Sequence, residues 1–490
     1  MSTNLISSRN LTMLTDFYEI TMANGYLAYG YEDKVAVFDM FFRKIPDNGG
    51  FAIFAGLEQL IHFLTNLKFS EEDLAYLRGL GLFSEEFLTY LKNFAFSCDI
   101  WSVPEGTPVF PNEPVVIVKG PIIQAQFIET MLLTTVNHQS LVATKANRIV
   151  RAAQGMEVME FGARRAQGYD GAIYGSRAAY IGGCSSTSCV ISAHEYGIPV
   201  TGTMAHSWIQ AFDSEYDAFK KYAELYPNNC ILLVDTYNVV KSGVPNAIRV
   251  FNEVLLPQGK RPIAIRIDSG DIAYLSKKAR RQLDEAGFTD VKIIASNSLD
   301  EYIIRDLLVQ NAAVDIFAVG ENLITSKSNP VFGGVYKLCA IEQDGELVPR
   351  IKLSETIEKV NLPHFKRLCR FFSKDTGRNV ADLVTLRDET IHVEHGITIF
   401  DPVASWKKKF LTNVEMKEML QPIFKEGKLV YNMPSIDEIR SYCLEQVGLL
   451  WDEVKRFEYP HKYYVDLSFK LWDLKNAMLA EMGAQSEEGQ

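Results

Sequence analysis

The residues best suited to chemistry gather around His206, where the sequence pattern changes from strand to helix. Residues 200–208 read VTGTMAHSW, and a helical pattern follows them. Loops at the carboxyl ends of parallel strands are open to ligands in α/β proteins. His206 is therefore either a reactive group on such a lip, as a general base or a nucleophile, or a histidine packed beneath a helix.

Polar groups also follow the other short apolar runs in this part of the chain. One such ending is only a turn signal, but their repetition at successive runs indicates the mouth of an active site. The groups at these endings are Gly162, Arg164, Arg165, Thr203, His206, Asp235, Thr236, Asp268, Ser269, Gly270, Asp271, Ser296, Asn297, Ser298, Gly320, Glu321 and Asn322, and Arg266 lies within one of the runs.

These residue types favour phosphorylated substrates. Arginine forms paired charged bonds with phosphate or carboxylate, and backbone N–H groups in Gly-Ser-Asn turns bind phosphate oxygens. Asp235 and Asp268 could hold Mg²⁺, which shares phosphate oxygens and takes few protein ligands. The residues alone therefore predict an enzyme acting on phosphorylated, magnesium-bound substrates.

The elements that must position these groups alternate between strand and helix. Strands are predicted at residues 158–161, 198–202, 230–235, 262–268, 291–295 and 315–319, with helices at 211–226, 244–256, 271–286 and 299–310. Continuous apolar strands separated by helices indicate a parallel sheet buried on both faces. We predict an α/β fold with an irregular (β/α) barrel at residues 155–340, and a doubly wound open sheet is the alternative. No GxGxxG motif supports a dinucleotide fold.

Two further domains flank the predicted barrel. Residues 1–154 read as a mixed α+β domain, with a helix at 12–29, a strand at 35–42, helices at 51–66 and 70–79, a β-rich stretch at 96–118 and a long helix at 122–154. Residues 341–490 read as a helix-rich C-terminal extension, mainly helical after residue 413, that packs on the other domains.

Composition narrows the class of protein. The net charge of −11 argues against nucleic acid as a partner, which needs a basic face. The seven cysteines are scattered without a zinc-binding spacing, which favours free thiols in a reducing cytoplasm. The first residues do not resemble a signal peptide, and no apolar run reaches the ~18 residues of a membrane span.

Short motifs along almost the whole chain resemble those of the nicotinate phosphoribosyltransferase family. They are LTDFY at 14–18, EFGARR at 160–165, GTMAHS at 202–207, IRIDSGD at 265–271, GGVYK at 333–337 and KLVY at 428–431. The resemblance implies that nicotinate and 5-phosphoribosyl 1-pyrophosphate (PRPP) are joined to give nicotinate mononucleotide and pyrophosphate. It also implies coupling to ATP through a phosphohistidine, Mg²⁺ as cofactor and a cytoplasmic homodimer with a shared active site.

The resemblance implies roles for the matching residues. His206 would be the phosphohistidine, with Asp235 and Asp268 as further catalytic residues. Tyr18 from a second subunit and Phe161 would sandwich the pyridine ring, and Arg165, Thr203 and Arg266 would hold its carboxylate or a neighbouring phosphate. The phosphoribosyl pocket would be lined by Ser296, Asn297, Gly320, Glu321, Gly333 and Gly334.

One loop departs from the family pattern. Cys189 stands where an asparagine is expected after Thr187 and Ser188, and a thiol is a weaker hydrogen-bonding group. Nicotinamide-using relatives carry an aspartate in this loop, so its absence favours a carboxylate substrate. The rival hypotheses are use of nicotinamide or quinolinate, a non-catalytic metabolite-binding protein, and an aldolase-type barrel, which would need a strand-end lysine that the barrel region lacks.

Overall fold

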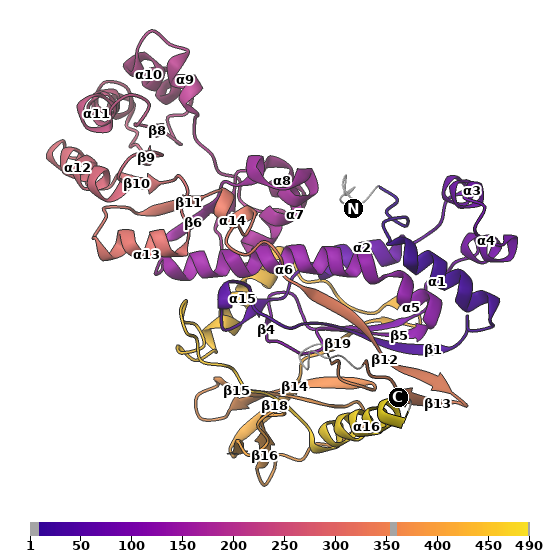
Figure 1. The fold of residues 1–490 in the computed structure, drawn as a ribbon. Helices are drawn as coiled ribbons and strands as arrows, with labels where there is room; N and C mark the ends of the chain where they lie inside the picture. The colour runs from indigo at the N-terminus through magenta and orange to yellow at the C-terminus, as the bar shows by residue number, and fades with distance from the viewer. Residues whose placement is uncertain (1–8, 353–359, 489–490) are drawn as a thin grey trace. The chain divides into compact units, whose positions relative to one another are not determined.

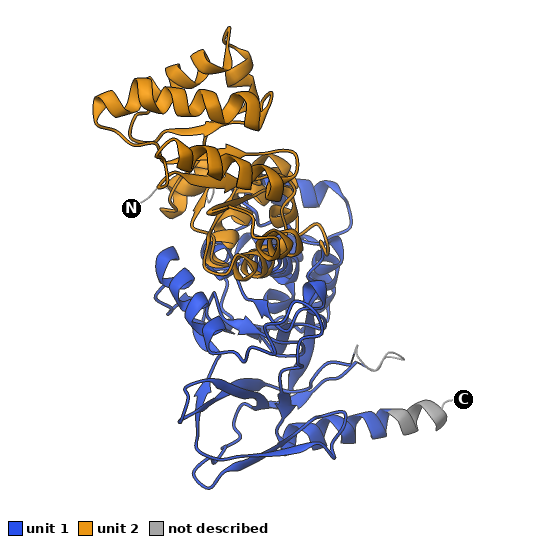
Figure 2. Cartoon of the chain, turned by 90° about the vertical axis from the view of Figure 1, so that its left-hand side faces the viewer, with its two compact units in different colours: residues 1–141, 331–490 blue, residues 142–330 orange. Residues whose placement is uncertain are grey.

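The computed structural model describes residues 9–352 and 360–488, with side chains described up to residue 482. Two compact units make up the chain (Figure 2): one runs to Leu141 and resumes at Val331, and the other is Val142–Pro330. The predicted three-domain division stays a prediction. Within the described ranges, no helix is long and apolar enough to cross a membrane.

The unit Val142–Pro330 is built on six parallel strands in the order β7-β6-β11-β10-β9-β8 (Figure 1). Their bounds are β6 Glu157–Glu160, β7 Ser186–Thr187, β8 Ile231–Leu233, β9 Ala264–Ile267, β10 Lys292–Ala295 and β11 Ile316–Val319. Every residue of β8, β9 and β11 is buried, as their sequences, apolar except for Arg266 in β9, predict. The sheet curls into a half-barrel with β7 and β8 at its edges, which confirms the parallel α/β core.

Helices follow the strands of this sheet, and their starts can be read from the sequence. The Asp271 carboxylate accepts from the Tyr274 N–H at 2.9 Å and the Asp300 carboxylate from the Ile303 N–H at 2.8 Å, so each caps a helix. The helices are α7 Gly168–Ile181, α8 Val190–Tyr196, α9 His206–Gln210, α10 Glu215–Leu225, α11 Val244–Val250, α12 Ile272–Glu285, α13 Glu301–Val309 and α14 Glu321–Ile324.

The strand predicted at residues 198–202 is wrong. Only Val200 pairs with the sheet, through an isolated bridge to Thr187, and Ser186–Thr187 form the edge strand β7 instead. Pro199 has no N–H to donate to a ladder, so the segment cannot continue the pairing. Residues 201–205 therefore remain a loop that leads into α9.

The other unit contains a mainly antiparallel sheet in the order β13-β12-β1-β5-β3-β19-β20. Its strands are β1 Val35–Phe42, β3 Asp99–Ser102, β5 Val116–Pro121, β12 Gly334–Gln343, β13 Glu346–Pro349, β19 Gln421–Lys425 and β20 Lys428–Leu429. Its helices include α1 Phe17–Ala28, α3 Glu71–Gly79, α4 Glu85–Lys92, α5 Ile122–Phe127 and the first part of α6 Glu129–Ala152.

The helix predicted at residues 51–66 begins later than expected. β2 Ala52–Ile53 pairs with β4 Pro108–Val109, and α2 is Leu57–Thr65. Gly56, before the helix, has a φ of 107°, which a residue with a side chain rarely adopts. The Glu105 carboxylate accepts from the Gly56 and Leu57 N–H groups at 2.6 and 3.1 Å, which fixes the start of α2.

The helix-rich C-terminal extension is also wrong, because this region is mostly strands. A four-stranded sheet has the order β18-β14-β15-β21, with β14 Lys366–Ser373, β15 Asn379–Leu386, β18 Val414–Glu418 and β21 Val465–Leu467. β16 Ile397–Phe400 and β17 Lys408–Leu411 form a hairpin, and the helices are α15 Ile436–Gly448 and α16 Phe469–Glu488. Val414 and Met416 pack on Phe371 while Glu415 is exposed, a two-residue period that defines a strand.

A buried ion pair holds the four-stranded sheet together. Arg370 and Asp382 are fully buried, and the Arg370 Nη2 donates to Asp382 Oδ2 at 2.6 Å while Tyr463 donates to Oδ1 at 3.0 Å. We expect Arg370→Met to lower the free energy of unfolding by about 3–5 kcal/mol, because it leaves the carboxylate buried and unpaired. Urea unfolding followed by tryptophan fluorescence measures this.

The matched control is Arg78→Met, which removes an exposed arginine paired with Glu85 in the same unit. Exposed pairs contribute little, so this variant should unfold at the same urea concentration as the unchanged protein. Equal midpoints for both variants would contradict a stabilising role for the buried pair.

Candidate active site

Arg266 is the centre of a cluster at the carboxyl ends of the parallel strands. It donates from Nε to Ser296 Oγ at 2.9 Å, from Nη1 to Thr203 Oγ1 at 3.1 Å and from Nη2 to Asp268 Oδ1 at 3.0 Å. Only 9% of Arg266 is exposed, and a buried guanidinium requires such partners. The structure thus joins groups from three separate segments around one cation.

Strand register explains why these groups meet. β9 and β10 are paired in parallel with Arg266 opposite Ile294 and Ile267 opposite Ala295, so Ser296 and Asp268 leave the sheet side by side. The Ser296 hydroxyl donates to the Asp268 carboxylate. Because neighbouring parallel strands end at the same edge, the predicted strand-end residues are brought together here.

Phe161 lies beside this cluster, directly after β6. Its N–H donates to the Val319 carbonyl at 2.8 Å, and its half-buried ring has its centroid 5.5 Å from the Arg266 Cζ. A side chain on the next residue, Gly162, would place its Cβ 2.6 Å from that of Ile324. The hydrogen bond to Val319 and the close packing at Gly162 therefore fix the position of Phe161.

His206 is the first residue of α9 and borders the same cluster. Its Nδ1 is 3.1 Å from Thr236 Oγ1, its Nε2 is 3.7 Å from Asp268 Oδ2, and 40% of its side chain is exposed. The tautomer decides which ring nitrogen carries the proton, and Nε2 has a free lone pair only in the form in which Nδ1 donates to Thr236. His206 therefore lies on the surface of the site, with part of its ring exposed.

Asp235 follows β8 and supports the loop after β9. Its Oδ2 accepts from the Asp268 N–H at 3.1 Å and from Ser269 Oγ at 2.6 Å, whereas its Oδ1 is buried without a hydrogen-bond partner. Asp235 Oδ1 thus fits a cation ligand better than Asp268, whose oxygens face Arg266, Ser296 and His206. In the described part of the chain, no group of three or more His, Cys, Asp or Glu side chains could hold a metal ion by itself.

The remaining predicted residues of this unit line the same edge. Asn297 and Ser298 have φ values of 86° and 48°, a strained conformation that often occurs at ligand sites. Gly320 and Glu321 follow β11, and Glu321 is paired with Lys327 at 2.7 Å and with the exposed Arg165 at 3.8 Å. Arg165 therefore contacts Glu321 and is not part of the Arg266 cluster.

Three predicted residues belong to the other unit. Tyr18, on α1, is 43% exposed, and burial together with Glu129 raises the pKa of its hydroxyl. Gly333 precedes β12 and Gly334 begins it; the Gly334 N–H donates to Asn137 Oδ1 at 3.1 Å. A Cβ on Gly334 would lie 2.2 Å from that oxygen, so a larger residue would displace the Asn137 side chain.

Sequence reasoning missed Glu160, the last residue of β6. Its fully buried carboxylate accepts from Thr187 Oγ1 at 2.6 Å, from Ser176 Oγ at 2.9 Å and from the Gly162 N–H, and burial raises its pKa. Glu160 thereby ties β6 to β7 and α7 and fixes the turn that carries Phe161. Its sequence signals were an acidic residue in an apolar run and the first position of the EFGARR motif at 160–165.

We expect Glu160→Gln to destabilise this unit by about 1–3 kcal/mol, because the amide turns an N–H₂ group towards donors and leaves them unsatisfied. Thermal unfolding measures the loss. Glu157→Gln is the matched control, since Glu157 lies on the same strand, is only half-buried and accepts from Ser185 at 2.8 Å. A Glu160 variant as stable as this control would contradict the role given to Glu160.

The loop with the unexpected cysteine packs inward. Cys189 is 9% exposed, its N–H donates to Thr187 Oγ1 at 3.0 Å, and its sulfur accepts from Ser192 Oγ at 3.3 Å. Thr187 in turn donates to Glu160, so both side chains serve the local structure of β7 and α8.

Comparisons with known proteins agree on one family. Models of the nicotinate phosphoribosyltransferase N-terminal domain, family domain and C-terminal domain match residues 13–137, 156–356 and 365–475. The chain is 45% identical to nicotinate phosphoribosyltransferase of Bacillus subtilis, over 98% of this chain and 97% of that protein. It is 39% identical to nicotinate phosphoribosyltransferase pncB2 of Mycobacterium tuberculosis, over 91% of this chain and 89% of that protein.

A solved structure supports the same relationship. The crystal structure of human nicotinic acid phosphoribosyltransferase matches with a TM-score of 0.83 and 28% identity, over 95% of this chain and all of that chain. The match extends across both compact units.

The fold and the strand-end cluster define an α/β enzyme whose site gathers Arg, His, Asp and Ser side chains at one edge of a parallel sheet. The three family models and the near full-length relatives then specify the family. The chain belongs to the nicotinate phosphoribosyltransferase family and is an enzyme of that class.

Proposed function

We propose that this enzyme transfers the phosphoribosyl group of PRPP to the ring nitrogen of nicotinate, giving nicotinate mononucleotide and pyrophosphate in NAD synthesis. A bond forms between the pyridine nitrogen and the ribose C1 as the bond from C1 to the pyrophosphate oxygen breaks. The nitrogen carries no proton, so the reaction needs no general base. Catalysis rests on positioning the ring and stabilising the leaving group.

The observation that carries this proposal is the Arg266 cluster beside Phe161. The planar, electron-poor pyridine ring stacks on an aromatic face such as Phe161. Arg266, whose guanidinium lies 5.5 Å from the centre of that ring, then offers its charge to the carboxylate, with Thr203 as a second donor. Tyr18 of a second subunit covers the other face of the pyridine, which makes a homodimer with a shared site the functional unit.

The loops after β10 and β11 suit the phosphoribosyl part of PRPP. Ser296, Asn297 and Gly320 offer hydroxyl, amide and backbone N–H donors to phosphate oxygens. Glu321 is anionic and suits the ribose hydroxyls, which donate. Arg165 neutralises Glu321 and adds a cation for phosphate.

His206 couples the reaction to ATP. Its Nε2 attacks the γ-phosphorus, the bond to the ADP oxygen breaks, and water later releases inorganic phosphate from the imidazole. The phosphoryl group would stand beside the Asp268 carboxylate, which lies 3.7 Å from Nε2. Repulsion between these anions favours rearrangement of the Arg266–Asp268 pair, so phosphorylation changes how the site binds its substrates.

The proposal also includes Mg²⁺ as cofactor and a cytoplasmic location. Asp235 Oδ1, buried without a hydrogen-bond partner, would bind Mg²⁺, which takes its other ligands from phosphate oxygens and water and neutralises their charge. Asp268 is the second candidate. All seven cysteines are buried and none forms a disulfide, which suits a reducing compartment.

Incubating the enzyme with PRPP, ATP, Mg²⁺ and one pyridine at a time tests the proposal. We expect nicotinate to give nicotinate mononucleotide and pyrophosphate in equal amounts, with kcat/KM at least about 100-fold above that for nicotinamide, since Arg266 offers a cation and no acidic acceptor. A preference for nicotinamide, or release of CO₂ from quinolinate as the main reaction, contradicts it.

A further inference from the structure

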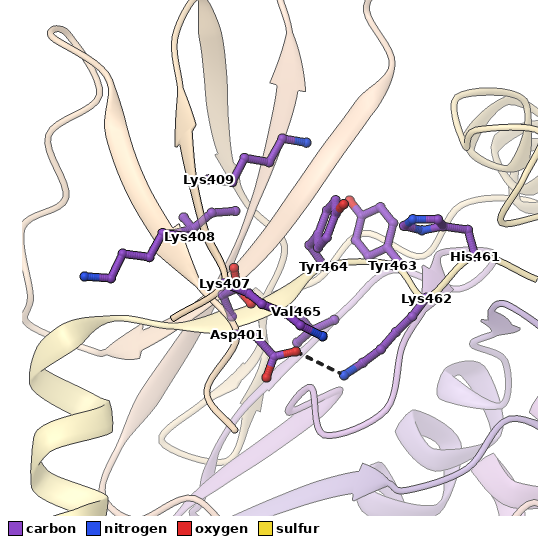
Figure 3. Close-up of a pocket in the computed structure, with 11 residues that line it drawn as sticks. Asp401, Lys407, Lys408, Lys409, His461, Lys462, Tyr463, Tyr464 and Val465 are labelled. Atoms are coloured by element: carbon purple, nitrogen blue, oxygen red, sulfur yellow. Dashed lines mark ion pairs between the residues drawn. The ribbon is translucent and has the colours of Figure 1, made fainter. Parts of the chain in front are cut away.

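A basic pocket lies in the unit that contains the C-terminal strands, and none of its residues belongs to the strand-end cluster. It has a volume of about 450 Å³ and lies between the β16–β17 hairpin and the segment that leads into β21 (Figure 3). Lys407, Lys408 and Lys409 come from the hairpin, and Lys462 comes from the segment before β21. Segments about fifty residues apart in sequence thus bring four lysines to the lining of one pocket.

Few carboxylates balance these cations. Lys462 Nζ is 3.5 Å from Asp401 Oδ2, whereas no acidic side chain of the described residues lies within 4.0 Å of the amino groups of Lys407 and Lys409. The second pocket carboxylate, Asp466, is only 4% exposed, and burial raises its pKa to about 6. An anionic ligand would therefore meet a surplus of positive charge.

Lys409 lies over aromatic rings, and the charge of Asp466 opposes the effect of burial on its pKa. Its Nζ is 4.7 Å from the centre of the Tyr464 ring and 5.5 Å from that of Trp451, and burial lowers its pKa. An ammonium group that lies over aromatic rings and is not paired with a carboxylate can still bind an anion. Because it is partly desolvated, its charge-assisted hydrogen bonds to that anion are strong.

An adjoining pocket of about 500 Å³ continues the positive surface. It shares Asp401 and Lys462 with the first pocket and adds Lys44 and Lys475. Lys475 is half-buried, and burial lowers its pKa. Ammonium groups thus occur on both sides of Lys462. This arrangement suits a ligand with negative charge at two or more positions better than a ligand with a single carboxylate.

We propose that this basic pocket binds the diphosphate group of a small anionic ligand, supplied either as free pyrophosphate or as part of a nucleotide. Lys407, Lys409 and Lys462 bind the phosphate oxygens, and Lys475 extends the contact into the adjoining pocket. A long nucleic acid is disfavoured because the chain as a whole carries a net charge of −11.

Lysine acetylation of the full-length protein, resolved by mass spectrometry, tests this site directly. Lys428 is the internal control, because it is exposed and lines neither pocket. With pyrophosphate or ADP at ten times the dissociation constant, we expect acetylation of Lys407, Lys409 and Lys462 to slow by about tenfold, and that of Lys428 to stay unchanged. If ADP protects at the lower concentration the source is a nucleotide, and if pyrophosphate does, the source is the free anion.

Two outcomes overturn the proposal: no protection of Lys409 and Lys462 by millimolar pyrophosphate or ADP, and equal protection of Lys428. Protection by adenosine alone would also overturn it, because adenosine has no phosphate. A Lys409→Gln/Lys462→Gln variant should lose the protection of Lys407, whereas Lys428→Gln should keep it, with circular dichroism confirming that both are folded. The readout is local to these lysines, so it does not depend on the reaction proposed above.

Discussion

Arg266→Gln should lower kcat/KM for nicotinate by about 10²- to 10³-fold. Arg266 donates to Ser296, Thr203 and Asp268 at once, and it is the buried cation beside Phe161. Glutamine keeps some hydrogen bonding but removes the charge that we propose holds the pyridine carboxylate. It also leaves Asp268 without its cationic partner, so we expect weaker substrate binding and a less stable loop after β9. Steady-state kinetics with nicotinate and PRPP measure the loss.

Two further variants make this result specific. Arg266→Lys keeps the charge but cannot reach three acceptors in one plane, so it should recover only part of the activity. Arg249→Gln changes an exposed arginine of the same unit that pairs with Glu253, and its kinetics should equal those of the unchanged enzyme. A folded Arg266→Gln enzyme with near-normal kcat/KM for nicotinate would contradict the proposed carboxylate site.

His206→Ala should abolish the stimulation of turnover by ATP and leave slow, ATP-independent transfer. The pyridine nitrogen needs no base, so removal of the imidazole spares the bond-forming step itself. The variant loses the nitrogen that we propose receives the γ-phosphate, and with it the negative charge that this phosphate would place next to Asp268. Rates of nicotinate mononucleotide formation with and without ATP, at saturating PRPP, measure the effect.

The control for His206 is His194→Ala, which removes a histidine of the same unit whose side chain is 77% exposed. This variant should keep full ATP stimulation. If His206→Ala also kept it, the phosphohistidine would have to be elsewhere or absent, and the role proposed for His206 would be wrong.

The sequence predicted the parallel sheet and its strand-end groups well, because each is a local signal. Apolar runs that end in polar residues identified β9 and Asp268, and parallel pairing then forced Ser296 and Asp268 together without further information. The same local reasoning failed at residues 198–202, where an apolar pattern suggested a strand but Pro199 prevents continued pairing.

Contacts between distant segments were beyond sequence reasoning. Glu160 reads as one acidic residue after an apolar run, and its role follows only once Thr187 and Ser176 surround its carboxylate. The C-terminal strands were misread for two reasons. β14 and β18 lie some forty residues apart, so no local pattern shows that they pair. The two-residue period of each strand is also weak in the sequence. The lysine pocket likewise depends on the hairpin and the β21 segment meeting in space.

Transfer of the γ-phosphate from labelled ATP tests the central claim most directly. With ATP and Mg²⁺, the unchanged enzyme should acquire a label at His206 that is labile in acid and stable in base, as expected of a phosphoryl group on nitrogen. The label should discharge as inorganic phosphate when PRPP and nicotinate are added, and His206→Ala should acquire none. A label that persists in His206→Ala, or one that does not respond to PRPP and nicotinate, would contradict the proposed mechanism.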